Sequence, residues 1–158
     1  MGKIIAVTNQ KGGVGKTTTC INLCCALTQL GKKVLLCDMD PQANSTSGMG
    51  IDKNSVAPSV YDVLINHAAP AQAVVETKYG YVLPANRILS GAGVELVNLE
   101  RREYRLAMAL RSIRDQYDYI LIDCPPSLEM LTINALCAAT GILVPIQCEY
   151  FALEGLGI

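Results

Sequence analysis

A glycine-rich stretch near the N-terminus has the composition of a phosphate-binding loop. Between an apolar run and a helical run the chain reads Gly12-Gly13-Val14-Gly15-Lys16-Thr17-Thr18. Glycines let successive N–H groups point inward as an anion nest, and a helix that starts at Lys16 adds its N-terminal dipole. This pattern predicts that Lys16 reaches the β- and γ-phosphates, that Thr17 offers its hydroxyl to Mg²⁺, and that Thr18 contacts phosphate. The loop is a variant, because Gln10 stands where the strict pattern has its first glycine.

Three aspartates follow apolar runs that have the character of buried strands. Asp38 and Asp40 follow "KVLLC", and Asp123 follows "YILI". Ligand chemistry in open parallel sheets lies at the carboxyl ends of strands, so Asp40 could orient a water molecule and Asp123 could lie near Mg²⁺. An ordinary turn before Pro41 explains the first pair equally well, and that alternative stays open on this stretch alone.

The elements that must position these residues alternate between strands and helices. Strands are predicted at 3–8, 33–38, 81–85, 119–124 and 141–147, and helices at 16–30, 59–66, 70–77, 95–114 and 128–139. Gly31 is suited to end the first of these helices, and the last residues look like the start of another. Such alternation indicates right-handed βαβ units. We therefore expect a three-layer α/β fold of the P-loop NTPase kind, with a mostly parallel sheet and helices on both faces, as one domain over 1–158.

Composition narrows the class of protein without naming a ligand. The 158 residues are 51% hydrophobic and 17% charged, which argues against disorder, and the net charge of -1 gives no sign of general nucleic-acid binding. The seven cysteines lie mostly in apolar runs and lack the short spacings of zinc sites, so we interpret them as reduced core residues of a cytoplasmic protein. No apolar run is long enough for a membrane span or a signal peptide.

Three motifs together carry a family resemblance. The stretches "NQKGGVGKTTT", "DMDPQANST" and "DYILIDCPPSLEMLTINAL" resemble the ParA/Soj family of chromosome- and plasmid-partitioning ATPases, and "VPIQCEYFALEGL" extends the similarity over the whole chain. This family belongs to the deviant Walker A ATPases, which include MinD. The run Asp40-Pro41-Gln42, followed by Asn44, is typical of the partitioning branch rather than of MinD.

The resemblance implies roles for individual residues. ATP or ADP with Mg²⁺ would bind along residues 11–18. Lys11, a signature residue of the family, would cross to the partner's nucleotide in an ATP-bound homodimer, where Gly12 would lie at the close contact. Asp40 would activate the attacking water, while Thr17 and Asp123 would hold the metal. A lysine supplied from a second subunit fits the charge that builds on the transferring phosphoryl group.

The resemblance also implies partners and an incomplete chain. The partners would be a ParB-type adaptor that stimulates slow hydrolysis and non-specific DNA at the nucleoid, with no membrane. Family members have roughly 250 residues, so we expect the last strands, the purine contacts and most DNA contacts to be missing, and an apolar edge to be exposed.

Alternatives to this interpretation remain open. One is a non-catalytic fragment that keeps the loop without a complete site, and others are a MinD-like membrane ATPase or an ATPase of a polysaccharide system. A further basic cluster on the helix predicted at 95–114 could touch DNA phosphates or an adaptor. We favour an ordinary solvated face there, because glutamates are interleaved with the arginines. His67 has no partner motif, so a surface role is expected for it.

Overall fold

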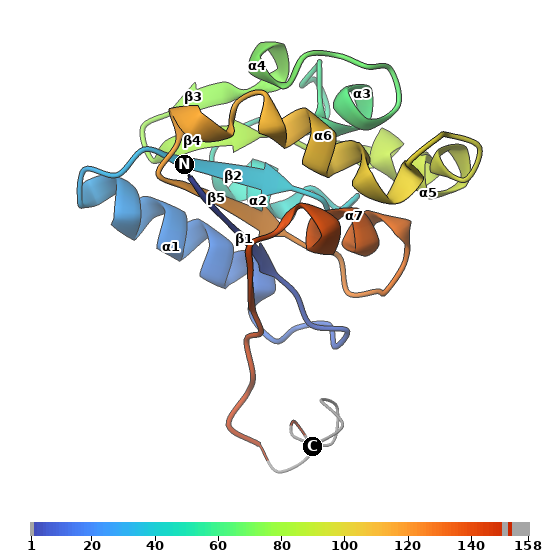
Figure 1. The fold of residues 1–158 in the computed structure, drawn as a ribbon. Coiled ribbons are helices and arrows are strands. Elements are labelled where there is room, and N and C mark those ends of the chain that lie inside the picture. Colours follow the sequence, from blue (N-terminus) through green and yellow to red (C-terminus); the bar gives the residue numbers. More distant parts are fainter. Residues whose placement is uncertain (1, 150–151, 153–158) are drawn as a thin grey trace.

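The computed structural model describes residues 2–149 and 152, and its centre is a six-stranded sheet (Figure 1). The strand order is β3-β4-β2-β5-β1-β6. All neighbouring pairs are parallel except β3 and β4, which are antiparallel. The strands are β1 (Lys3–Val7), β2 (Val34–Asp38), β3 (Val75–Thr77), β4 (Gly80–Leu83), β5 (Tyr119–Asp123) and β6 (Gly141–Leu143). The expected mostly parallel α/β sheet is confirmed.

Both faces of the sheet are covered, because side chains of the central strands alternate between two apolar clusters. Helix α1 (Lys16–Gln29) packs Cys20 and Cys24 on one face, against Val34, Leu36 and Leu121. Ile4, Leu35, Ile120 and others point to the opposite face. That face is covered by α3 (Val60–Leu64), α4 (Pro70–Ala73), α5 (Ala92–Leu96), α6 (Arg105–Arg111) and α7 (Met130–Ala138).

Helix α1 has glycines at both ends in conformations that other residues rarely adopt. Gly15 precedes its first residue with φ 95°, and Gly31 follows Leu30 with φ 76°. Both angles lie in the left-handed region, where glycine has no steric penalty. The prediction that Gly31 ends this helix is therefore confirmed.

The predicted long helix over 95–114 was wrong. The chain instead forms α5 and α6, with a turn between them at Arg101, whose φ is 52°. Asn134 of α7 explains why the helix can break here. Its side chain accepts a hydrogen bond from the backbone N–H of Leu106 (3.1 Å) and donates one to the carbonyl of Arg102 (2.8 Å). Backbone groups that the break would leave unpaired are thereby satisfied.

Three shorter predictions also need correction. The helix predicted at 70–77 ends at Ala73, and the β-branched residues after it form β3 against β4. The stretch between the strand predicted at 33–38 and the helix predicted at 59–66, where no element was predicted, contains the helix α2 (Asn44–Gly48). The strand predicted at 141–147 ends at Leu143, and Ile142 within it is 60% exposed. The helix predicted in the last residues lies mostly outside the described part of the chain.

The cysteines divide by burial. Cys20, Cys24, Cys37 and Cys124 are buried, Cys25 is partly buried, and Cys137 and Cys148 are exposed. Within residues 2–149 and 152, no group of three His, Cys, Asp or Glu side chains is placed to hold a metal ion. In the same residues, none of the helices combines the length and apolar character that crossing a bilayer requires.

Candidate functional site

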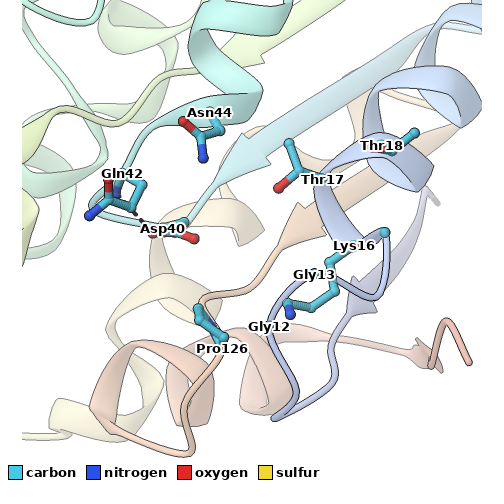
Figure 2. A pocket seen from close by; sticks show the side chains of 10 residues that line it. Gly12, Gly13, Lys16, Thr17, Thr18, Asp40, Gln42, Asn44 and Pro126 are labelled. Atoms are coloured by element: carbon cyan, nitrogen blue, oxygen red, sulfur yellow. Dashed lines mark hydrogen bonds between the residues drawn. The ribbon is translucent and has the colours of Figure 1, made fainter. Parts of the chain in front are cut away.

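The glycine loop forms one wall of a pocket of about 410 Å³ at the carboxyl edge of the sheet. Figure 2 shows the loop and the start of α1 facing Asp40 and Pro126 across this pocket. Its lining comes from three strand-to-helix connections and consists of Gly12, Gly13, Gly15, Lys16, Thr17, Thr18, Asp40, Gln42, Asn44 and Pro126. The first turn of α1 brings unpaired backbone N–H groups to this wall, which favours an anion.

Lys16 is held close to the loop that precedes it. The residue is only 7% exposed, and its ammonium group donates a hydrogen bond to the carbonyl of Lys11 (2.9 Å). An ammonium group has three donors. The one contact to Lys11 fixes the side chain and leaves donors for a phosphate in the pocket.

Thr17 and Asp123, the two predicted metal ligands, lie together. The Thr17 hydroxyl donates to Asp123 Oδ2 at 2.8 Å, and the hydroxyl of Ser45 donates to the same oxygen. The second oxygen, Oδ1, is buried and has no hydrogen-bond partner in the described residues. Burial raises the pKa of Asp123 above its ordinary value. A hard cation would compensate such a carboxylate, and a hydroxyl with a carboxylate is the oxygen donor set that suits Mg²⁺.

Asp38 and Asp40 differ sharply in their surroundings. Asp38 is fully buried and accepts hydrogen bonds from the N–H and the hydroxyl of Thr46, at 2.9 and 2.7 Å. Burial raises the pKa of Asp38 to about 7, although these hydrogen bonds act in the opposite direction. Asp40 instead lines the pocket and accepts from the N–H of Gln42 (2.9 Å), which leaves its second oxygen for a ligand. Of the two, Asp40 is the one placed to meet a substrate.

Lys11 points away from the pocket that Lys16 serves. Its side chain is 54% exposed and lies 4.0 Å from the carboxylate of Glu149. With Val14 it lines a separate hollow, formed by Asn9, Gln10, Ile146, Gln147 and Ala152. The predicted site residues therefore fall into two groups. Gly12, Gly13, Gly15, Lys16, Thr17, Thr18 and Asp40 line one pocket, Asp123 lies behind Thr17, and the Lys11 and Val14 side chains lie outside.

For several residues of the site, the sequence predicted no role in ligand binding. Gln42, Asn44 and Pro126 line the pocket, while Ser45 and Thr46 bind the buried aspartates. The signal available was the run of small polar residues after Pro41, in which Gln42 and Asn44 served only to distinguish the partitioning branch and no role was predicted for Ser45 or Thr46. Ser45 and its hydrogen-bond partner Asp123 are 78 positions apart in the sequence, so no local pattern could reveal that contact.

The basic cluster is spread over the break between α5 and α6. Arg102 pairs with Glu103 (2.8 Å), and Arg105 donates to the carbonyl of Leu64 (3.0 Å) and contacts the ring of His67. These contacts tie two of the arginines to their own chain.

Comparison with known proteins gives a family for this arrangement. The profile of the AAA domain family matches residues 2–158. The chain belongs to this family. It is 55% identical to the sporulation initiation inhibitor protein Soj of Bacillus subtilis over 158 residues, which is 99% of this chain and 62% of that protein. The resemblance to the ParA/Soj group is thereby confirmed.

Solved structures agree with this assignment. A cobyrinic acid a,c-diamide synthase from Mycobacterium smegmatis, with bound ADP and magnesium, superimposes with a TM-score of 0.95 at 46% identity. That match covers 99% of this chain and 64% of the other. A plasmid partition protein from Borrelia burgdorferi gives 0.86 at 30% identity, over 99% of this chain and 69% of the other. The chain thus spans about 60% of the length of the first curated relatives it matches.

Proposed function

We propose that this chain carries the phosphate site of a ParA-type ATPase, which binds Mg-ATP and hydrolyses it slowly. The observation that carries the proposal is the meeting of Lys16, the Thr17–Asp123 pair and Asp40 around one pocket at the carboxyl edge of the sheet. The ADP and magnesium bound to the Mycobacterium smegmatis neighbour support the choice of ligand.

Each residue contributes a separate effect to hydrolysis. The glycine loop and the N-terminus of α1 bind the phosphates, and Lys16 neutralises charge on the β- and γ-oxygens. When bound, Mg²⁺ supplies further charge neutralisation there, with Thr17 and Asp123 as the residues that hold it. Asp40 accepts a hydrogen bond from the attacking water and orients it toward the γ-phosphate.

The cellular role proposed is DNA segregation through an ATP-dependent homodimer. Lys11 points outward from its own pocket, as a residue must if it serves a second subunit. Gly12 has open space where a side chain would be, which leaves room there for the close approach of a second subunit. A ParB-type adaptor and non-specific DNA are the proposed partners, and the nucleoid in the cytoplasm is the proposed location.

Asp40 provides the test of hydrolysis. Asp40→Asn keeps the shape and removes the charge, so we expect ATP to bind within about twofold of the unmodified protein while turnover falls by about 100-fold. Binding would be measured with a fluorescent ATP analogue, and turnover by phosphate release with and without Mg²⁺.

The matched control is Asp52→Asn. Asp52 is an exposed loop aspartate whose contacts are to Asn54 and Ser55, outside the pocket. Normal turnover by Asp40→Asn, or Mg²⁺-independent turnover by the unmodified protein, would contradict the proposed function.

A further inference from the structure

The first turn of α2 is bonded to the ends of two neighbouring strands. Asp38 and Asp123 are the last residues of β2 and β5, and they are paired in the parallel register. Ser45 donates its hydroxyl to Asp123, and the next residue, Thr46, donates both its hydroxyl and its N–H to Asp38. Two consecutive residues of α2 therefore each hold one of two adjacent buried carboxylates.

These contacts are shielded from water, which makes them strong. Asp38, Ser45 and Thr46 are fully buried, and Asp123 is 1% exposed. Hydrogen bonds to a carboxylate are stronger than neutral ones, and a low local dielectric strengthens them further. The Thr46 hydroxyl also accepts from the N–H of Ala85 (2.9 Å), which extends the network to the segment after β4.

The segment between these contacts is the one that brings Asp40 to the pocket. At its start the N–H of Asp40 donates to Asp38 (3.1 Å), and at its end lies the Ser45–Thr46 pair. Ala43, between them, has φ 52°, a left-handed conformation that is unfavourable for a residue with a side chain. Local preference alone would not hold this shape, so contacts with other parts of the chain must hold it: those at the two ends, and the hydrogen bond from Lys53 to the carbonyl of Gln42 (2.6 Å).

We propose that Ser45 and Thr46 are positioning residues: they fasten the segment 39–46 to the ends of β2 and β5 and so hold Asp40 at the phosphate pocket. This inference rests on the proposed function for the part played by Asp40, whereas the fastening itself depends only on the contacts above. Because Thr17 and Ser45 donate to the same oxygen of Asp123, the segment is also linked to the residue pair proposed to hold the metal.

Thr46→Val is the sharpest test, because it keeps the shape of the side chain and removes the hydroxyl. We expect amide hydrogen exchange over residues 39–50 of the nucleotide-free protein to become about tenfold faster, as the loss of one hydrogen bond to a charged group implies. We also expect kcat for ATP to fall about tenfold while KM changes less than about twofold, since the phosphate contacts are untouched. Thr46→Ser restores the hydroxyl and should recover both values.

The control is Ser47→Ala, on the same short helix but exposed to solvent. It should leave both the exchange rate and kcat unchanged. If Thr46→Val fails to fold, Ser45→Ala replaces it, with the same expected increase in exchange over 39–50. Exchange in the variant equal to that in Ser47→Ala would overturn the proposal.

The two proposals fail in different ways. If the unmodified protein does not hydrolyse ATP, the proposed function is wrong, and exchange over 39–50 still decides whether the segment is fastened by Ser45 and Thr46. The positioning role is wrong under a different outcome, in which the unmodified protein hydrolyses ATP. In that outcome Thr46→Val both lowers kcat and raises KM, and Thr46→Ser restores neither value.

Discussion

The two lysines of the glycine loop lie only five residues apart and have opposite surroundings. Lys16 is almost completely buried and donates a hydrogen bond to the backbone carbonyl of Lys11, within a pocket built from three connections of the same chain. Lys11 is more than half exposed and pairs loosely with Glu149 at 4.0 Å. An exposed pair at that distance contributes little to stability. The difference indicates that Lys16 completes a site within the chain, whereas Lys11 is available to a molecule outside it.

The largest effect should come from removing the inner lysine. Lys16→Ala deletes the one cation of the phosphate pocket within the described residues, so we expect ATP binding to weaken by about 100-fold and hydrolysis to become undetectable. Isothermal titration with Mg-ATP measures the first effect and phosphate release the second. A circular dichroism spectrum equal to that of the unmodified protein serves as the folding control. Unchanged ATP affinity would show that Lys16 does not complete the phosphate site.

Removing the outer lysine should have a narrower effect. We expect Lys11→Ala to keep the affinity for ATP within about threefold of that of the unmodified protein. Its rate of ATP hydrolysis should fall about 100-fold, and its ATP-driven dimerisation should be lost. Light scattering with and without ATP measures the dimer. If Lys11→Ala hydrolyses ATP normally as a monomer, the proposed action on a partner's nucleotide is wrong.

The smallest effect concerns the pH dependence of stability, and we expect it to come from the buried carboxyl group of Asp38. Burial raises the pKa of Asp38 from 3.8 to about 7, so folding favours its protonated form. The free energy of unfolding is then greatest below pH 4 with respect to this group, and it decreases as pH rises toward 7. Asp123 is shifted in the same direction and adds to the trend.

Urea denaturation at pH 5 and pH 8, without nucleotide or Mg²⁺, measures this dependence. Asp38→Asn should reduce the difference between the two pH values, because it cannot ionise. Glu149→Gln, in the exposed surroundings of Lys11, should leave the difference as it is. Equal pH dependence in the unmodified protein and in Asp38→Asn would show that the inner carboxylate does not control it.

Local signals made the phosphate loop predictable from the sequence. The glycines, Lys16 and Thr17 are contiguous, and Gly31 marks the end of α1 by its own conformational freedom. The order of strands and helices followed from continuous apolar runs, which are typical of a sheet buried on both faces. These features depend on residues that are close in the sequence.

The errors have a different physical origin. Leucines continue at helical spacing through the region where the chain breaks at Arg101, and the break is stabilised by Asn134, 28 residues beyond Leu106. Ser45 and Thr46 looked like loop residues because their partners are carboxylates on other strands. Contacts between distant segments thus decided both cases, and no pattern within either segment contains them.

The burial of the cysteines has a practical consequence for labelling. Burial raises the pKa of the Cys124 thiol to about 12, and Cys20 is shifted in the same direction, so both remain in the unreactive thiol form at neutral pH. Cys137 and Cys148 are exposed and open to maleimide reagents. Cys148 directly precedes Glu149, the residue beside Lys11. A fluorophore attached there, in a background with Cys25→Ser and Cys137→Ser, would report on the surroundings of the outer lysine while the phosphate pocket stays unmodified.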